Sequence, residues 1–244
     1  MSVLPATPLA ATSGSQLDWY LTRATGSVAL LLLTLALALG VADVQRFSTP
    51  AWPRFVLDAL HRNVSLLALV FLVLHVLTSV LDSFAPISLL AAFVPFASSY
   101  RPLWLGLGAV AFDLMLAVIV TSLLRQRVGH RAWRITHWLA YACWPIALLH
   151  SLGTGSDVKS TWLLALTALC MALVAAAVLT RALGGLSRET AGGRLAAVGG
   201  LAAFVLGLLL WLPGGPLGSE WARRAGTPTA LLGHAASGAH GGQR

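Results

Sequence analysis

Four histidines lie inside apolar stretches of the sequence, at His61, His75, His137 and His150. Ionisable side chains inside such stretches are costly, so a group of them marks a candidate functional site. The first two histidines are 14 positions apart, and the last two are 13 positions apart. On helices, which rise about 1.5 Å per residue, these spacings correspond to about 21 Å and about 20 Å. Two parallel helices would therefore bring the imidazoles together in pairs at two matched depths.

Imidazoles paired at matched depths are suited to holding a flat iron cofactor. The two axial positions of a haem iron lie on opposite faces of the porphyrin, so each face needs one ligand. We therefore expect His61 and His137 to ligate one haem b, and His75 and His150 to ligate a second. Two haems stacked in this way would carry electrons across a membrane.

Two other interpretations of these histidines stay open. In an ion channel or transporter they would bind a metal ion, but such sites favour i, i+4 spacing or mixed carboxylate and thiol ligands. The two stretches contain no pair of histidines, or of histidine and cysteine, at that spacing. In a transporter or assembly factor they would be neutral structural histidines. That interpretation suits a single histidine better than a pattern of four.

The expected direction of the side chains agrees with this arrangement on one helix and disagrees on the other. Fourteen residues return to within about 40° of the starting direction, so His61 and His75 share a face. Thirteen residues miss by about 140°, so His137 and His150 would not share a face on a straight helix. Pro145 lies between them and has no backbone N–H, so we expect it to kink or rewind the helix there.

Six apolar runs are long enough to place these residues inside a lipid bilayer. Of the 244 residues, 57% are hydrophobic and 10% are charged, whereas soluble domains carry about 25% charged residues. Because about 20 residues cross the hydrocarbon core, the sequence predicts an all-α integral membrane protein, a six-helix transmembrane bundle binding two b haems. The expected spans are 20–44, 60–81, 103–124, 135–152, 161–183 and 195–212. Residues 1–17 are expected to be a flexible N-terminal segment, 18–212 the membrane domain and 213–244 a flexible extracytoplasmic tail.

The basic residues predict the orientation of these spans. The formal net charge is +8, yet the basic residues lie in the connections between spans, so no nucleic-acid partner is expected. The connections after the first, third and fifth spans hold ten of them: Arg46, Arg54, Arg62, Arg125, Arg127, Arg131, Arg134, Arg181, Arg188 and Arg194. The opposite side holds six: Arg23, Arg101, Lys159, Arg223, Arg224 and Arg244. The positive-inside rule then puts both termini outside the cytoplasm. The single lysine, in an Ala-, Leu-, Gly- and Arg-rich chain, indicates a GC-rich bacterial genome and hence a bacterial inner membrane.

The histidines and their neighbours resemble the ferric reductase-like transmembrane domain, which ferric reductases, NADPH oxidases and smaller haem-only bacterial proteins share. The resemblance covers residues 18–184 and rests on Leu60-His61-Arg62-Asn63, Leu74-His75, Arg134-Ile135-Thr136-His137 and Leu149-His150. It implies two b haems, each bridging the two histidine-bearing helices. Arg23 resembles an arginine that the oxidases place near the outer haem.

The chain departs from the larger family members, which continue into a cytoplasmic flavin and nicotinamide domain. It has no Gly-x-Gly-x-x-Gly motif after a strand, and the sixth span has no counterpart in the match. We therefore expect no flavin or NAD domain in this chain, which would be the cytochrome b subunit of an oxidoreductase. Electrons would enter from quinol or a cytoplasmic reductase and leave to an extracytoplasmic redox protein, flavin-binding proteins included. An alternative is that the outer haem itself reduces ferric chelates or oxygen.

Charged residues near the two levels are candidates for pairing with the haem propionates. Arg62 and Arg134 flank the cytoplasmic level, and Arg23 and Lys159 lie at the outer level. A carboxylate near the membrane needs a charge-assisted partner, although anchoring under the positive-inside rule is an alternative for Arg62 and Arg134. Asp113, in the third run, is either part of a proton relay or hydrogen-bonded to Tyr141 or a threonine. Aromatic residues expected between the levels, for electron tunnelling or for packing, are Phe71, Trp138, Tyr141 and Trp144.

Overall fold

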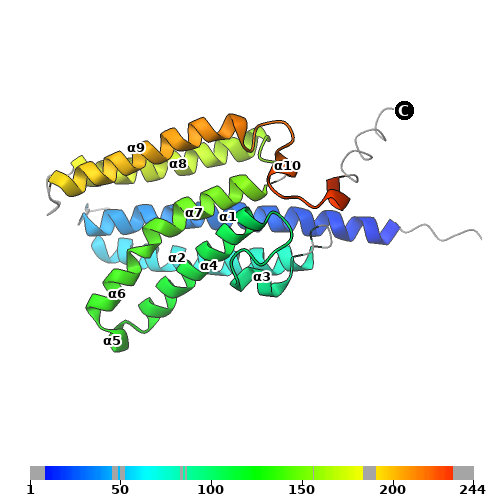
Figure 1. Cartoon of the computed structure of the whole chain (residues 1–244). Coiled ribbons are helices and arrows are strands. Elements are labelled where there is room, and N and C mark those ends of the chain that lie inside the picture. The colour runs from blue at the N-terminus through cyan, green and yellow to red at the C-terminus, as the bar shows by residue number, and fades with distance from the viewer. Residues whose placement is uncertain are drawn as a thin grey trace, which may run out of the picture.

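The computed structural model describes residues 9–45, 49, 53–82, 85, 87–155, 157–183 and 191–232. The elements that they form are all helices, as the sequence predicted (Figure 1). These are α1 (Leu9–Val44), α2 (Arg54–Leu81), α3 (Leu89–Phe93), α4 (Pro102–Leu123), α5 (Arg125–Val128), α6 (His130–His137), α7 (Leu139–Thr154), α8 (Thr161–Leu183), α9 (Ala191–Gly214) and α10 (Trp221–Arg224).

Among the described residues, five helices are long and apolar enough to cross a membrane, so the chain is a multi-pass membrane protein. They are α2, α4, α8, α9 and the part of α1 from Leu17 to Val44. The expected fourth span is divided between α6 and α7, and neither part reaches spanning length by itself. Trp138 separates the two parts, and its backbone remains helical at φ −64° and ψ −22°.

The helix that carries His137 and His150 is interrupted at Trp138, seven residues before Pro145. α7 runs through Pro145 without a break. At Trp138, by contrast, the backbone N–H faces the carbonyls of Arg134, Ile135 and Thr136 together. Such shared, tightened bonding is typical of a 3₁₀-like turn, which advances about 120° per residue instead of about 100°. Such a turn of about three residues adds about 60°, which is part of the roughly 140° that His137 and His150 need to share a face. The expected kink or rewinding at Pro145 stays a prediction.

α1 lies at the centre of the helix packing, because it contacts α2, α7 and α8. α7 packs in turn against α4, and α9 packs against α8. Lipid tails are as apolar as leucine, so small residues that let helix backbones approach are favoured at such contacts. Ala68 of α2 and Ala111 of α4 are of this kind, being 1% and 7% exposed. Large side chains of α2, such as Leu66 and Val70, are instead exposed along the outside of the bundle.

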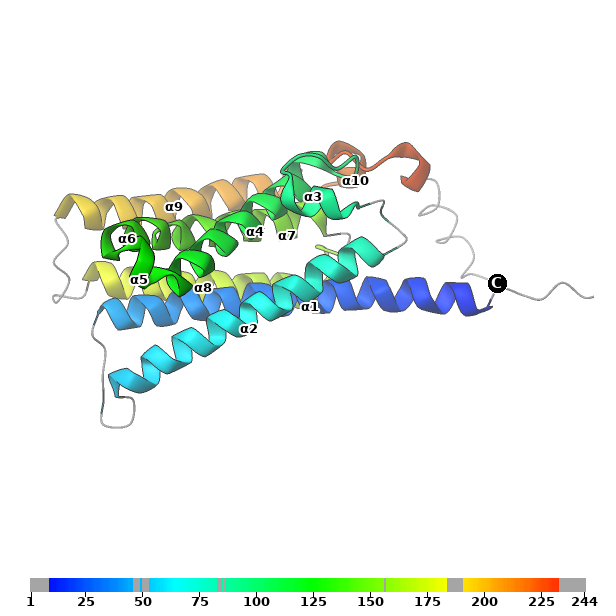
Figure 2. The ribbon, with the colours of Figure 1, turned by 90° about the horizontal axis from the view of Figure 1, so that it is seen from below.

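The two ends of the bundle differ in what covers them. In both views α3 and α10 lie at one end, and α5 lies at the other (Figure 1 and Figure 2). We call these the α10 end and the α5 end. α1 begins at Leu9, so residues 9–17 of the segment expected to be flexible are helical, and residues 1–8 lie outside the described residues. Within the expected tail, residues 215–227 include α10 and bond to the start of α4, and residues 233–244 lie outside the described residues.

Candidate cofactor site between two histidine pairs

The four histidines come together as two facing pairs. The rings of His61 and His137 have centroids 6.3 Å apart at 70° between planes, and we call them the first pair. The rings of His75 and His150 have centroids 6.2 Å apart at 73°, and we call them the second pair. Since the lower-numbered histidine of α2 meets the lower-numbered one of α6–α7, these helices run in the same direction. The parallel arrangement and the two levels agree with the spacing in the sequence.

The ring separation fits one metal ion between each pair of imidazoles. A ligating imidazole nitrogen lies about 2 Å from a first-row metal such as zinc, and its ring centroid lies about 1 Å further back. Two imidazoles on opposite sides of one metal therefore have centroids about 6 Å apart, as both pairs do. A direct hydrogen bond or tight stacking between the rings would bring the centroids closer.

Backbone carbonyls fix the orientation of three of the four rings. The Nδ1 atoms donate to carbonyl oxygens at 2.9 Å: His61 to Ala36, His75 to Thr22 and His150 to Trp104. A carbonyl oxygen only accepts, so Nδ1 carries the proton in each ring, and Nε2 keeps its lone pair for a ligand. Metal-binding histidines usually donate their second nitrogen in this way, which fixes the ring and strengthens it as a ligand.

His137 is held differently from the other three histidines. Its Nδ1 is buried and has no hydrogen-bond partner among the described residues. The ring instead stacks on Trp133, with centroids 5.1 Å apart at 29°. His137 is also the last residue of α6, directly before the interruption at Trp138.

Glycines make room for the anchored rings. A Cβ added at Gly26 of α1 would lie 2.9 Å from the His75 ring, and one at Gly40 would lie 3.2 Å from the His61 ring. A Cβ at Gly108 of α4 would lie 2.5 Å from the His150 ring. Glycine weakens a helix interior by about 1 kcal/mol relative to alanine, so its presence here has a packing reason. These glycines were not among the residues predicted from the sequence, although Gly26 and Gly40 repeat the 14-residue spacing of the α2 histidines.

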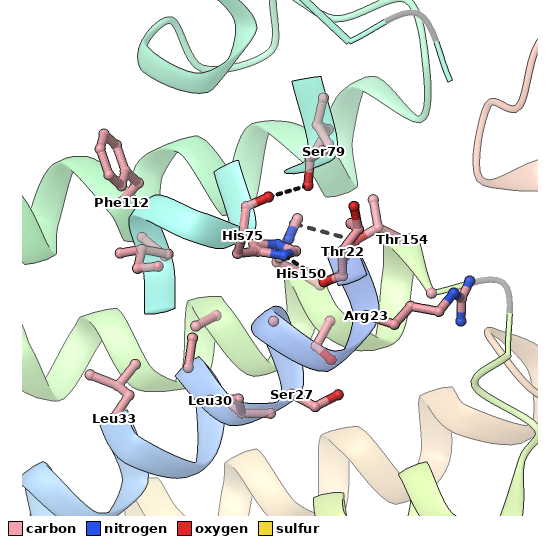
Figure 3. Close-up of a pocket in the computed structure, with 18 of the residues that line it drawn as sticks. Thr22, Arg23, Ser27, Leu30, Leu33, His75, Ser79, Phe112, His150 and Thr154 are labelled. Carbon is pink, nitrogen blue, oxygen red and sulfur yellow. Dashed lines mark hydrogen bonds between the residues drawn. The ribbon is translucent and has the colours of Figure 1, made fainter. Parts of the chain in front are cut away.

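Each pair lines a cavity. The second pair borders a cavity of about 220 Å³ lined mainly by α1, α2, α4, α7 and α8 (Figure 3). The first pair borders one of about 120 Å³. Met115 and Cys143 line both cavities, so the two adjoin. Most of the lining is apolar, including Leu30 and Leu33, which keeps water away from the space between the rings.

Among the four candidate propionate partners, the structure brings Arg23 to a cavity. Arg23 lines the larger cavity, forms an ion pair with Asp157 and lies 3.9 Å over the Trp19 ring. Arg62, Arg134 and Lys159 are exposed, and within the described chain none of them lines either cavity. Their positions are those expected of charges that anchor the chain at the membrane surface.

Asp113 and Tyr141, which were candidates for a mutual hydrogen bond, differ in their surroundings. Asp113 is half-buried, and the Tyr141 hydroxyl accepts a hydrogen bond of 2.8 Å from Arg181. From the sequence, Arg181 counted only as one of the basic residues that set the orientation. In the structure it lies on α8 and donates to Tyr141, which lines the smaller cavity.

The two tryptophans expected between the levels differ in burial. Trp144 is 2% exposed and donates to Thr34, whereas Trp138 is 55% exposed. Two further histidines, His234 and His240, lie outside the described residues.

In the described part of the chain, neither pair has a third protein ligand nearby. Among the residues that the structure describes, no group of three or more His, Cys, Asp or Glu side chains is placed to hold a metal ion. Each pair therefore offers a metal two imidazoles, one from each side. A metal bound there needs its remaining ligands from another source, and a porphyrin supplies four in one plane.

Comparison with known proteins places this site in a family. A family model described as the ferric reductase like transmembrane component matches residues 25–148. No curated protein and no solved structure matches the chain. The matched residues include His61, His75 and His137 and end just before His150. Since the match covers half of the chain, the protein belongs to the ferric reductase-like transmembrane family.

Proposed function

We propose that this protein is a membrane cytochrome that carries electrons across a lipid bilayer through two non-covalent b haems. His61 and His137 hold the haem nearer the α5 end, and His75 and His150 hold the haem nearer the α10 end. Membership of the ferric reductase-like family supports transmembrane electron transfer as the general role. The two haems, their ligands and their stacking are the specific content of the proposal.

The observation that carries the proposal is that two imidazoles face each other at each of two levels, with no third ligand among the described residues. Zinc sites use three or four protein ligands. The described residues around each pair offer only two, which is too few for a site that binds a bare metal ion during transport. Structural histidines have no reason to face each other in two pairs at the spacing of one metal ion. A haem iron has its four equatorial positions filled and requires only the two axial ligands that each pair provides.

The chain's own residues prepare the site. The Ala36, Thr22 and Trp104 carbonyls orient three imidazoles, and the adjoining glycines leave space for the rings. The apolar lining excludes water. When bound, the haems accept and release single electrons without making or breaking bonds in the protein. The 14-residue separation on α2 corresponds to about 21 Å of rise, so both levels fit within a hydrocarbon core about 30 Å thick.

The proposal also specifies the orientation and the partners. α6 and α7 together form a sixth crossing, and both termini lie outside the cytoplasm of a bacterial inner membrane. The first pair is then on the cytoplasmic side, where quinol or a separate reductase donates electrons. The second pair is on the outer side, where an extracytoplasmic redox protein accepts them, and Arg23 pairs there with a haem propionate.

The test of this function is electron transfer across a sealed membrane. Purified protein is reconstituted into liposomes that enclose ferricyanide, and dithionite or a reduced quinone analogue is added outside. The proposal predicts that enclosed ferricyanide is reduced with the unmodified protein and is not reduced with His75→Ala. A second set of liposomes enclosing ferric citrate distinguishes reduction of a small acceptor from a requirement for a protein partner. Equal rates with the unmodified protein and with His75→Ala would contradict the proposal.

A further inference from the structure

A cluster of aromatic and polar residues closes the α10 end of the bundle. It joins α4, α9 and the segment after α9, and we call it the α10 clamp. Its members are Arg101, Trp104, Trp211, Trp221 and Thr227. The family model ends at residue 148, so the last three members lie outside the part of the chain that the family model matches.

Three tryptophans form the apolar part of the α10 clamp. Trp104 of α4 stacks on Trp211 of α9, with ring centroids 5.0 Å apart at 28°. Trp221 of α10 covers both rings, at 5.3 Å from Trp104 and 5.6 Å from Trp211. Its indole N–H donates to the Gly153 carbonyl at 3.2 Å. Gly153 must be glycine, because a Cβ there would lie 2.1 Å from the Trp104 ring.

Arg101 forms the polar part of the α10 clamp. Its side chain is 3% exposed and donates to the Gly153 and Thr154 carbonyls at 3.1 Å and 3.0 Å. These carbonyls end α7 and have no partner within the helix, so a cation there is favourable. Thr227 completes the contact by accepting from Arg101 Nε at 2.9 Å, and the Arg101 backbone N–H donates to Gly226. Burial lowers the pKa of Arg101, and these acceptors offset the cost of burying its charge.

Both parts of the α10 clamp end at the same imidazole. The Trp104 carbonyl accepts the Nδ1–H of His150 at 2.9 Å. Thr154, whose carbonyl Arg101 holds, bonds through its hydroxyl to the His150 carbonyl and lies 3.3 Å from His150 Nδ1. α7 ends four residues after His150. The clamp thus fixes both the acceptor of the ring and the helix end that carries the ring.

We propose that the α10 clamp is a positioning device for the second histidine pair, and that it sets how firmly His150 ligates its haem. This inference rests on the proposed function, since it concerns the ligand strength of one proposed axial histidine. None of its five members lines either cavity. They act instead through the Trp104 carbonyl and through the end of α7. Removing the hydrogen-bond partner of a metal-binding histidine typically lowers metal affinity by about 10-fold to 100-fold.

Two variants weaken the clamp without touching either histidine pair. Thr227→Val keeps the shape of the side chain and removes the acceptor of Arg101 Nε. Trp221→Ala removes the ring that covers Trp104 and Trp211, and it removes the hydrogen bond to the Gly153 carbonyl. Thr227→Ser restores the hydroxyl, and Arg223→Ala is a matched control, because Arg223 lies on α10, is exposed and pairs with Glu220.

The measurement is carbon monoxide binding to the dithionite-reduced protein, together with low-spin signals in the oxidised protein by electron paramagnetic resonance. Ferrous haem with two firm imidazole ligands excludes carbon monoxide, whereas haem with a loosened ligand binds it. The haem of the second pair is identified as the component that His75→Ala removes. We expect Thr227→Val to raise the fraction of the second-pair haem that binds carbon monoxide, and Trp221→Ala to raise it further. In Trp221→Ala this haem should also be lost about 10-fold faster than in the unmodified protein.

The two proposals fail in different ways. Thr227→Ser and Arg223→Ala should match the unmodified protein, and the first-pair haem should keep its spectrum in every variant. If Thr227→Val and Trp221→Ala leave the second-pair haem unchanged, or alter both haems equally, the clamp has no positioning role. If the unmodified protein contains no haem, the proposed function itself is wrong. Thr227→Val removes one hydroxyl acceptor while keeping the side chain's shape, so the test holds even if Trp221→Ala fails to fold.

Discussion

The two histidine pairs have the same ring spacing but different surroundings. Both imidazoles of the second pair donate from Nδ1 to backbone carbonyls, and the α10 clamp holds the helix end beside His150. In the first pair His61 has such a bond, while the buried Nδ1 of His137 has no partner in the part of the chain that the structure describes. Ring spacing decides whether a metal fits, whereas the Nδ1 bonds and the continuity of the helix decide how firmly each ligand is held.

Removing an axial histidine should give the largest effect and should test whether the two pairs are separate sites. We expect His61→Ala or His137→Ala to remove one haem, and His75→Ala or His150→Ala to remove the other. Haem content should fall from about two to about one per chain, because iron has two axial positions and each pair fills both.

The double variant His61→Ala with His137→Ala should lose little more than either single variant, because residues that share one partner are not additive. Absorption spectra of the four single variants check the assignment. Loss of the same haem in His61→Ala and His150→Ala would contradict the arrangement of the pairs.

Alanine at the glycines that face the rings should give a graded effect. The added Cβ would lie 2.5 Å from the ring at Gly108, 2.9 Å at Gly26 and 3.2 Å at Gly40. We therefore expect haem occupancy to fall most in Gly108→Ala and least in Gly40→Ala. Gly207→Ala on α9 is the matched control, since no described atom lies within 4 Å of its added Cβ.

The glycine series separates haem binding from stability. Alanine favours a helix over glycine by about 1 kcal/mol, so Gly207→Ala should raise thermal stability slightly with unchanged haem content. Haem content per folded chain, measured after size-exclusion chromatography, is the readout. An order of occupancy unrelated to the ring distances would show that the glycines do not serve the rings.

The unpartnered Nδ1 of His137 predicts a difference in reduction potential. An imidazole that donates from Nδ1 is the more basic ligand and favours ferric iron. The first-pair haem should therefore have the higher potential and should be lost first on dilution into detergent, by about 10-fold in affinity. A spectroelectrochemical titration, with each haem assigned through its histidine variant, measures this. A first-pair potential equal to or below that of the second pair would contradict the comparison.

The smallest effects are expected from the basic residues. Arg23 lines the larger cavity, so Arg23→Gln should shift the spectrum or potential of the second-pair haem. Arg62 and Arg134 are exposed, so Arg62→Gln and Arg134→Gln should leave both haem spectra unchanged. Difference spectra of the three variants compare the two levels directly. A change at the first pair in Arg134→Gln would show that this arginine does reach the cofactor.

The levels of the histidines could be predicted from the sequence because helical rise is nearly constant. Spacings of 14 and 13 residues therefore give matched depths on any two parallel helices. The direction of the side chains depends instead on local winding. The Trp138 N–H faces three carbonyls at once, an irregularity that no residue type in the sequence signals. Pro145 was the expected site because proline is the commonest cause of a kink, and that expectation stays a prediction.

The α10 clamp could not be predicted from local composition. The segment after α9 is rich in Gly, Ala and Pro, which is typical of a flexible tail, and its order comes from contacts distant in sequence. Trp221 packs on Trp104, and Thr227 bonds to Arg101. The repeat of Gly26 and Gly40, by contrast, was available in the sequence. It matches the spacing of His61 and His75 because antiparallel α1 and α2 share the same rise.

The central claim is that each histidine pair holds one b haem, and haem content tests it most directly. A pyridine haemochrome assay on the purified protein, with protein quantified by amino-acid analysis, gives the number and type of haems per chain. The account predicts about two b-type haems in the unmodified protein, and about one in both His61→Ala and His75→Ala, each with a different remaining spectrum. A single haem in the unmodified protein that either variant abolishes, or no haem at all, would contradict it.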